Sequence, residues 1–488
     1  LAAEWDIGNG DITVNAGSGG QTVTQGSQVD VPDSAPVITG STTENTLTIN
    51  AEKDQTASVT LSGANIDVSN EGKAAVSTTG EGNVSIELDG DSTLKSGKGH
   101  AGLEKKNGGK LTIADEDKNG KLTAEGGKYG AGIGGGDQGA GSGITITGGE
   151  IKATGGQYGA GIGGGKGDGS DITISGGEVN ATGGTSGAGI GGGYNGNGSD
   201  ITITDGEVNA TGGKYGAGIG GGEYGIGKDI IITGGEVNAT GGRFSAGIGG
   251  GSRGTGSDIT ISGGEVNASG GVNGAGIGGG LRSKGKDITV SGDTKLKVQG
   301  GDEDHYDGAG AGIGDGGSNA YGTKILGAEV EPDTSGLTTN GSIAYYAPGA
   351  DMETDKPTST TVGASSQPEK PTDPGAERGA DAPLYRVTDQ DGKDIAHKAE
   401  RKDGVLTVTV DADFAILTGK LSSIDTLKRQ GIEKIVFVTN KAASTFQAAD
   451  LLEKGASSDA YSLTHDGATV TFVVSEKKTD VSGILIQP

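Results

Sequence analysis

Two sets of acidic residues recur at a fixed interval of 29 residues, and carboxylates are the groups by which this sequence could bind metal ions or polar ligands. The first set is Asp171, Asp200, Asp229, Asp258 and Asp287, and the second is Glu178, Glu207, Glu236 and Glu265. If successive units stack at the strand spacing of ~4.8 Å, neighbouring carboxylates repel by about 1 kcal/mol in water. A hard cation such as Ca²⁺ would offset this repulsion, so we expect the aspartates to bind calcium and the glutamates to contact a ligand. The alternative is that both sets are exposed and screened by salt and by Lys228 and Lys286.

A second candidate calcium site is a short acidic segment before the clear repeats. Asp115, Asp117 and Asn119 supply oxygens at positions 1, 3 and 5 of a calcium loop, and Gly120 stands at position 6, where the loop must turn. The pattern ends there, because Gly126 occupies position 12 instead of the usual Glu. The segment is therefore either a calcium site or a plain acidic turn.

Aromatic residues are rare in this chain and recur at equivalent positions of the repeat. Tyr194 and Tyr224 stand in variable segments that follow three glycines, and we expect them to lie on a ligand-binding surface. A second group stands two places before the Ala of the Gly-Ala-Gly-Ile or Ser-Ala-Gly-Ile segments, at Tyr129, Tyr158, Tyr215 and Phe244, and Ser186 and Asn273 interrupt this column. Stacked rings could bind the apolar faces of sugars, but alternation along the strand places this group on the core side, so packing at the core edge is expected.

Hydroxyl-bearing residues also recur in pairs, and catalytic residues do not. Paired Thr and Ser columns, such as Thr173 with Ser175 and Thr202 with Thr204, could form the flat array of an ice-binding surface, or reflect the ordinary enrichment of Thr in strands. The six clear repeats contain three Arg, at 243, 253 and 282, and the chain has His only at 100, 305, 397 and 465. No local catalytic signature is present, and we expect a protein that is not an enzyme.

The elements that position these residues form a repeat. The Ile of the Gly-Ile-Gly core recurs at 133, 162, 190, 219, 248 and 277, and a degenerate copy follows at Ile313 after a longer loop. Each unit contains three short segments separated by glycines, and the first two alternate apolar and polar residues as half-buried strands do. Three strands in 29 residues predict one coil of a parallel β-helix. Inward-facing residues are then Ile172, Ile174, Val179, Ala181, Ala188 and Ile190. Glycines at the corners allow φ > 0 and a close approach of adjacent coils.

The weaker upstream copies extend this pattern. We expect an all-β architecture of about nine or ten coils of 26–29 residues within 45–349, preceded by a cap over 1–44. Residues 350–382 have the composition of a linker. Residues 383–488 read as a small α+β domain, with strands at 405–410, 435–438 and 470–474 and helices at 423–430 and 444–454.

Composition limits the partners. The 488-residue chain has 104 Gly, no Cys and a formal net charge of −26, which disfavours nucleic acid and anionic membrane surfaces. No apolar run is long enough to span a membrane, so no membrane insertion is expected. The start at Leu1 without Met suits a mature, exported product, and the absence of Cys fits export.

The Ala-Gly-Ile-Gly-Gly-Gly and Asp-Ile-Thr-Ile-Ser-Gly-Gly-Glu-Val-Asn-Ala-Thr-Gly-Gly units resemble those of surface proteins of gram-positive bacteria. That group is similar to the pectate-lyase-like right-handed parallel β-helices and includes non-catalytic proteins that bind polygalacturonate, with Ca²⁺ in the fold. The resemblance covers about residues 45–330. It implies a right-handed parallel β-helix, and it indicates fold better than ligand. The wall-sorting motif Leu-Pro-x-Thr-Gly is not found in this sequence.

The leading functional hypothesis is an extracellular, secreted or cell-surface, monomeric binding protein or adhesin. It would present the β-helix to a polysaccharide or to a host-surface glycan or glycoprotein, with Ca²⁺ as a possible cofactor. A structural stalk without ligand, a polysaccharide lyase and, more remotely, an ice-binding protein are the alternatives.

Overall fold

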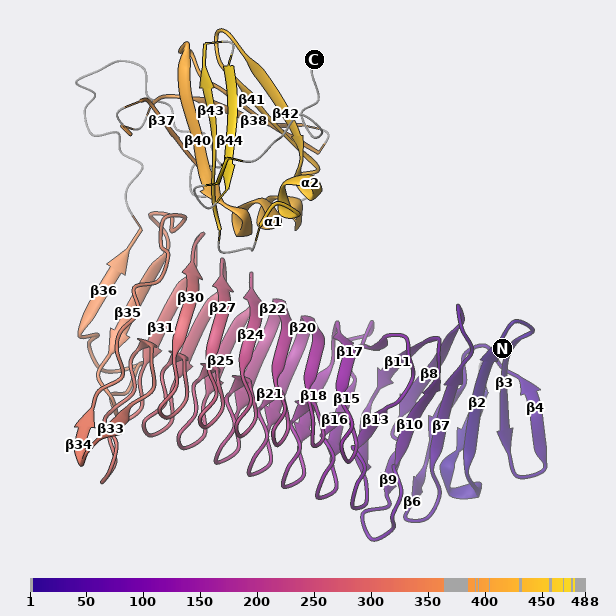
Figure 1. Ribbon diagram of the computed structural model, residues 1–488. Helices are drawn as coiled ribbons and strands as arrows, with labels where there is room; N and C mark the ends of the chain where they lie inside the picture. Colours follow the sequence, from indigo (N-terminus) through magenta and orange to yellow (C-terminus); the bar gives the residue numbers. More distant parts are fainter. Residues whose placement is uncertain are drawn as a thin grey trace. The chain divides into compact units, whose positions relative to one another are not determined.

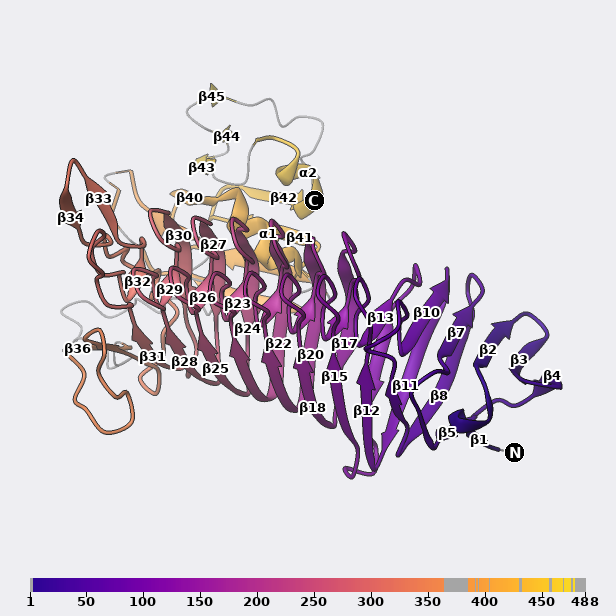
Figure 2. The ribbon, with the colours of Figure 1, turned by 90° about the horizontal axis from the view of Figure 1, so that it is seen from below.

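The computed structural model describes residues 3–363, 385–390, 392–393, 395–402, 404–429, 432–455, 459–467, 469–474 and 477–478. The chain divides into two compact units, residues 1–366 and 367–488, and each is treated by itself below. The first unit is the predicted β-helix, in which strands of successive rungs lie side by side and run in the same direction (Figures 1 and 2).

The regular rungs have three strands each, as the repeat predicts, whereas the described residues of the first rung form only β1 and a third strand, β2 (Ile12–Gly17). The first strands of the rungs are β1 (Glu4–Asp6), β5 (Val37–Thr39), β8 (Thr56–Ser62), β11 (Asn83–Asp89), β14 (Leu111–Ala114), β17 (Gly141–Ile146), β24 (Gly227–Ile232), β27 (Gly256–Ile261) and β30 (Gly285–Val290). The second strands are β6 (Ser41–Thr42), β9 (Asn65–Asp67), β12 (Asp91–Lys95), β15 (Lys121–Glu125), β18 (Glu150–Thr154), β25 (Glu236–Thr240), β28 (Glu265–Ser269), β31 (Lys295–Gln299) and β35 (Ser342–Tyr346). In two rungs the first and second strands join, as β20 (Gly169–Thr182) and β22 (Gly198–Thr211).

The third strands form a separate sheet. Its parallel members are β2 (Ile12–Gly17), β7 (Leu47–Ala51), β10 (Val76–Gly80), β13 (Leu103–Lys105), β16 (Ile133–Gly134), β19 (Ile162–Gly163), β21 (Ile190–Gly191), β23 (Ile219–Gly220), β26 (Ile248–Gly249), β29 (Ile277–Gly278) and β32 (Ile313–Gly314). Within the described residues this sheet therefore contains eleven successive rungs, more than the nine or ten expected.

Equivalent residues of successive rungs are paired in exact register, and this register builds the core. Ile172 pairs with Ile201, and Val179 with Val208. The predicted inward residues are all buried, and one continuous aliphatic core runs from Trp5 to Ile343. Alternation of apolar and polar residues thus predicted which side chains fill the interior.

The glycines serve the close stacking of the corners. Gly191 has φ = 131°, a backbone conformation that glycine adopts readily and other residues rarely adopt. A Cβ atom on Gly213 would overlap the carbonyl oxygen of Gly184 in the preceding rung. The glycine at this corner is therefore required by backbone packing between rungs and not by a ligand.

The first forty-four residues, where we expected a cap, contain both a rung and a cover. β2 pairs parallel with β7, so stacking begins earlier than the sequence indicated. The hairpin of β3 (Gly20–Gln25) and β4 (Gln28–Pro32) then continues the sheet in antiparallel pairing and covers its end. A 3₁₀ turn, η1 (Ile7–Asn9), lies between β1 and β2.

The other end of the β-helix is irregular. A long segment separates β31 from β32, and a hairpin of β33 (Ser318–Ala320) and β34 (Thr323–Ile325) follows. β36 (Ser359–Val362) falls inside the expected linker 350–382, yet it pairs antiparallel with β35 and belongs to the first unit. Residues 364–382 of that linker lie outside the described residues.

The second unit contains two sheets and two short helices. One sheet consists of β37 (Arg386–Thr388), β40 (Phe414–Lys420), β43 (Ala460–Asp466), β44 (Thr469–Val474) and β45 (Lys477–Lys478), and the other of β38 (Lys398–Lys402), β39 (Val405–Thr409), β41 (Lys434–Val438) and β42 (Ala443–Gln447). The helices are α1 (Leu421–Arg429) and α2 (Ala448–Leu452). A separate aliphatic and aromatic core stabilises this unit.

The three predicted strands of this unit are confirmed as β39, β41 and β44, whereas one helix boundary was wrong. Ser444 was expected to cap a helix over 444–454. Ser444 lies instead in β42, and the helix begins at Ala448. The side chain of Ser444 is fully buried, and its Oγ lies 2.6 Å from Nε2 of His465. Strand pairing with β41 outweighed the local capping pattern. Among the described residues, no helix is long and apolar enough to cross a membrane.

Candidate functional site

The acidic segment predicted to bind calcium forms a self-contained turn. The carboxylate of Asp115 accepts hydrogen bonds from the backbone N–H groups of Asn119 (3.1 Å) and Gly120 (3.0 Å), and Nδ2 of Asn119 donates to Asp89 (3.1 Å). Asp117 is exposed. The carboxylate of Asp115 is therefore already satisfied by backbone N–H groups of its own turn, as in a plain acidic turn, and calcium binding by this segment stays a prediction.

The aspartate column has a backbone explanation. Asp171, Asp200, Asp229 and Asp258 have φ between 49° and 55°, and Asp287 shares this conformation. Each of them is left out of the strand pairing while the register on both sides is kept, so that they form a column of unpaired residues. Gly143 holds the same place one rung earlier, with φ = 69°. Aspartate recurs here because, after glycine and asparagine, it is the residue that best tolerates the left-handed region.

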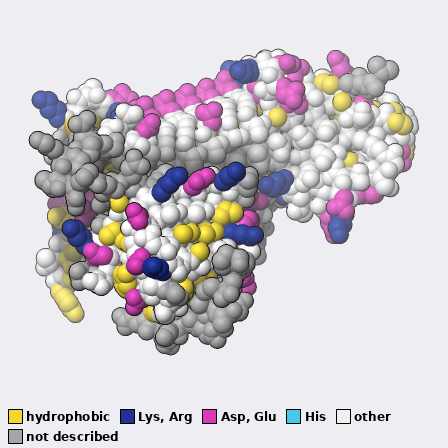
Figure 3. Space-filling view, turned by 90° about the horizontal axis from the view of Figure 1, so that it is seen from above, with side chains coloured by type: hydrophobic (Ala, Val, Ile, Leu, Met, Phe, Trp, Pro, Cys, Tyr) yellow, Lys and Arg dark blue, Asp and Glu magenta, His cyan; other side chains and the backbone are white. Residues whose placement is uncertain are grey.

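The glutamate column is exposed and in register. Glu178, Glu207, Glu236 and Glu265 pair in sequence, and Lys121 and Lys295 occupy the equivalent places towards the two ends of the column. Nζ of Lys121 lies 2.7 Å from Glu150, and this contact raises the pKa of Lys121. Figure 3 shows a straight row of acidic side chains along the β-helix, which is the arrangement expected when equivalent acidic residues of successive rungs stack in register.

A ladder of amides runs beside these glutamates. Nδ2 of Asn209 donates to Oδ1 of Asn180 (3.1 Å), Asn238 donates to Asn209 (2.9 Å), and Asn267 donates to Asn238 (2.7 Å). Nδ2 of Asn180 donates in turn to Glu178 (3.1 Å). Across the described residues, no group of three or more His, Cys, Asp or Glu side chains is arranged to hold a metal ion.

The aromatic residues form one array at a corner of the β-helix. The rings of Tyr129 and Tyr158 stack at 5.3 Å between centroids, Tyr158 contacts Tyr194 edge-on at 5.5 Å, and Tyr194 contacts Tyr224 at 6.3 Å. A second stack joins Tyr215 and Phe244 at 6.2 Å.

The expectation of core-edge packing for Tyr129, Tyr158, Tyr215 and Phe244 was wrong, because each is partly exposed and none packs against the aliphatic core. Parity failed because these residues lie in turns, where side chains do not alternate. Tyr224 is exposed, as expected of a surface residue, whereas Tyr194 is only partly exposed, and the two groups that looked separate in sequence form one aromatic corner.

The aromatic corner leads into an open depression of about 360 Å³. Its lining comes from five turns of three neighbouring rungs and from the long segment between β31 and β32, and comprises Tyr215, Glu223, Tyr224, Phe244, Ser252, Arg253, Leu281, Arg282, Asp304, Tyr306 and Asp307. Four aromatic rings, two guanidinium groups and three carboxylates therefore share one concave surface. Such a mixture of ring faces with a few polar groups is typical of small-molecule and sugar sites.

Several of these residues adopt an unfavourable backbone. Tyr224 has φ = 65°, Phe244 76°, Arg253 63° and Arg282 58°. A bulky residue in this region costs about 1 kcal/mol or more relative to glycine. At the position equivalent to Tyr224 and Arg253, an earlier rung has Asn195, which tolerates the left-handed region. Bulky side chains at these turns weaken the fold, and strain of this kind is typical of functional sites.

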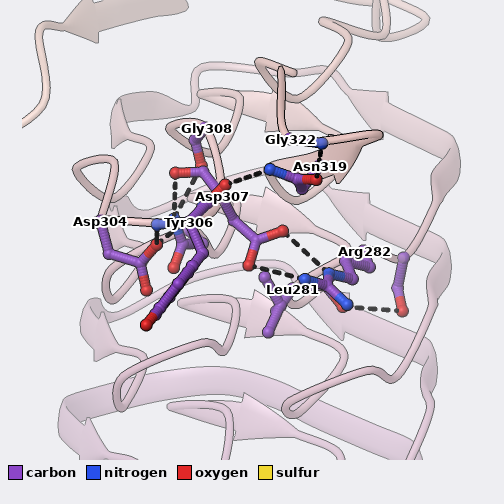
Figure 4. Close-up of polar contacts among 10 residues, drawn as sticks. Leu281, Arg282, Asp304, Tyr306, Asp307, Gly308, Asn319 and Gly322 are labelled. Carbon is purple, nitrogen blue, oxygen red and sulfur yellow. Dashed lines mark hydrogen bonds and ion pairs between the residues drawn. The ribbon is translucent and has the colours of Figure 1, made fainter. Parts of the chain in front are cut away.

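The wall of the depression is fixed by hydrogen bonds (Figure 4). Arg282 donates to both carboxylate oxygens of Asp307, at 2.8 and 3.0 Å, and this pairing raises the pKa of Arg282. Burial opposes ionisation of Asp304, but hydrogen bonds from the N–H groups of Asp307 and Tyr306, with the nearby Arg243, lower its pKa overall. Asn319 of β33 holds the carbonyl of Tyr306 at 2.6 Å.

Sequence reasoning missed most of this lining. Arg253, Arg282, Tyr306 and the two aspartates of the long segment were not predicted as site residues. The usable signal was the departure from the repeat itself: bulky residues replace the expected Gly or Asn in the turns, and the last unit carries an insertion before Ile313.

Comparison with protein families supports the fold. Six stretches match the model described as a beta helix repeat, at residues 118–137, 144–166, 172–194, 201–223, 230–252 and 259–281. Comparisons with curated proteins and with solved structures gave no match. Together with the in-register parallel strands, the repeat match shows that this chain contains a right-handed parallel β-helix, the predicted fold class.

Proposed function

We propose that this chain is a non-catalytic binding protein that recognises a glycan at the aromatic corner and its terminal depression. The observation that carries the proposal is the backbone of the lining: Tyr224, Phe244 and Arg253 all have positive φ. Their side chains add nothing to the buried core and their conformations cost stability, so a role in binding accounts for them best.

The chemistry of the corner suits sugars. Ring faces pack against the C–H faces of a pyranose, and carboxylates and guanidinium groups hydrogen-bond its hydroxyls. Successive rungs repeat at ~4.8 Å, so the rings are spaced along an axis that an extended chain of sugars could follow. Arg253 is exposed and has no hydrogen bond or ion pair within the described residues, which leaves its guanidinium available to a ligand.

The state of the acids favours binding over catalysis. A general acid needs a raised pKa, whereas the pKa of Asp304 is lowered. Asp307 is held by two hydrogen bonds from Arg282, so neither partner of that pair is free to move a proton. A polysaccharide lyase remains the second candidate, because Arg253, Glu223 and Asp304 line the same depression.

A glycan array with the full chain tests the proposal. We expect binding to at least one glycan, and we expect the variant Phe244→Ala, Tyr224→Ala to weaken it at least tenfold. Tyr321→Ala is the matched control, since Tyr321 is fully exposed on the hairpin outside the lining. Absence of binding to every glycan would contradict the proposal and favour a stalk, and release of unsaturated sugars would favour the lyase.

Location and cofactors belong to the same proposal. We place the protein outside the cell, secreted or on its surface, as a monomer without nucleic-acid partners. A repeat of the array in the presence of EDTA examines the calcium prediction. Because the carboxylate of Asp115 is already hydrogen-bonded and the aspartate columns have a backbone explanation, binding is expected to persist without calcium.

A further inference from the structure

Three lysine side chains gather around one ring at the other end of the aromatic corner. Nζ of Lys98, Lys128 and Lys166 lies 5.8, 5.4 and 5.8 Å from the centroid of Tyr129. Lys128 also lies 5.9 Å from the ring of Tyr158, and Lys166 lies 5.9 Å from that of Tyr194. The ammonium groups come from three different turns, and stacking of the rungs brings them together.

This lysine cluster, Lys98, Lys128 and Lys166, has no anionic partner in the part of the chain that the structure describes. The neighbouring buried carboxylate of Glu104 is already paired with Lys106 and, at 2.9 Å, with Nδ1 of His100. Asp137 is exposed on the next turn but forms no ion pair with the three lysines. Three ammonium groups thus repel one another on a chain whose net charge is −26. Contact with the Tyr129 ring compensates part of this repulsion.

We propose that the lysine cluster binds a phosphate monoester carried by the glycan that occupies the aromatic corner. A phosphate monoester has a charge of about −1.5 to −2 near pH 7 and three strong acceptor oxygens, which match three separate ammonium donors. A single carboxylate offers one charge and two oxygens and is better matched by the fork of an arginine. The sugar that carries the phosphate would lie on the rings of Tyr158 and Tyr194, so this inference rests on the proposed function of the corner.

Calorimetric titration of the full chain with glucose 6-phosphate tests the inference. We expect glucose 6-phosphate to bind more tightly than inorganic phosphate, which lacks the sugar, and more tightly than glucuronate, which carries one charge. The variant Lys98→Gln, Lys128→Gln, Lys166→Gln should raise the Kd for glucose 6-phosphate at least tenfold. A control variant, Lys53→Gln, Lys110→Gln, Lys152→Gln, changes the net charge equally at exposed sites elsewhere and should change the Kd less than twofold.

The pH dependence separates a dianion from any other anion. The second pKa of a phosphate monoester is about 6, so affinity should fall when the pH is lowered from 7.5 to 5.5. Protonation of the neighbouring His100, Glu104 or Asp137 would add positive charge near the cluster and strengthen anion binding, so it would act in the opposite direction. A fall in affinity therefore reports protonation of the phosphate.

Two results would overturn the inference. One is equal binding of glucose 6-phosphate by wild type and by the triple lysine variant, and the other is binding of glucuronate as tight as that of glucose 6-phosphate. Either result leaves the proposed glycan site intact if Phe244→Ala, Tyr224→Ala still weakens binding on the array at least tenfold. Loss of array binding in wild type, by contrast, contradicts the proposed function itself.

Discussion

The strand faces and the aromatic corner of the β-helix both contain residues in the left-handed backbone conformation, but the residue types that adopt it differ. On the strand faces, the left-handed positions carry Asp171 and its equivalents, which tolerate that conformation. At the corner, the left-handed positions carry Tyr224, Phe244 and Arg253, which do not. Regular repetition therefore marks residues that the fold needs. Departure from the repeat, where it costs stability, marks residues that something other than the fold requires.

The largest effect should come from the stacking glycines, where the fold has no alternative. Gly213→Ala places a Cβ against the carbonyl oxygen of Gly184, and we expect a loss of about 3 kcal/mol or more in the free energy of unfolding. Fluorescence of Trp5, the only Trp, reports unfolding of the β-helix in denaturant. Gly72→Ala is the control, because nothing lies near its Cβ position. Equal stability of the two variants would break the argument from close stacking.

The second unit, in which we found no repeat, offers a contrast with the β-helix, because it contains a buried cluster of polar side chains: Thr439, Ser444 and His465. His465 is fully buried between Thr439 and Ser444, and burial lowers its pKa from 6.5 to about 4. The neutral form is favoured in the folded state, so stability is complete above pH 6.5 and falls between pH 6.5 and 4, by up to about 3 kcal/mol. Calorimetry of the full chain across this range should show the decline, and His465→Gln should flatten it. An unchanged profile in the variant would show that another group titrates.

The aspartate column separates the backbone explanation from metal binding. Asp200→Asn should leave stability within about 0.5 kcal/mol, because Asn tolerates positive φ, whereas Asp200→Ala should lose about 1 kcal/mol. Added calcium should alter neither result. If Asn proves as destabilising as Ala, or if calcium stabilises wild type alone, the carboxylate itself is needed and the calcium prediction regains its support.

At the aromatic corner, replacing a residue in the left-handed conformation should increase the stability of the protein instead of lowering it. Arg253→Asn replaces a strained residue with the type found at the equivalent Asn195, and we expect the free energy of unfolding to rise by about 1 kcal/mol. Denaturant unfolding measures this small gain. A loss of stability would mean that Arg253 supports the fold, and the distinction between corner and strand face would fail there.

Sequence periodicity predicted the β-helix well because burial in a rung follows strict alternation, as at Ile172 and Val179. It failed where structure is not periodic. The pairing of β2 with β7 was missed because the sequence of the first rung departs from the repeat. Ser444 was assigned to a helix because residues 444–447 match a helix-capping pattern, although they form a strand.

The candidate site was predicted only in part for a related reason. Tyr194 and Tyr224 were identified from their place after three glycines, but Tyr158 was expected to pack at the edge of the core. Which turns meet at one corner depends on the path of the chain between strands, and spacing along the sequence does not reveal it. The sign of φ at Arg253 likewise has no signature in the residue type itself.

The central claim is that the strained residues of the aromatic corner serve a ligand. The most direct test compares wild type with the variant Tyr224→Asn, Phe244→Asn, Arg253→Asn, measuring both the free energy of unfolding and the Kd for a glycan identified on the array. We predict that the variant is more stable by about 2 kcal/mol or more and binds at least tenfold more weakly. A variant that is less stable and binds the glycan as tightly as wild type would contradict the account.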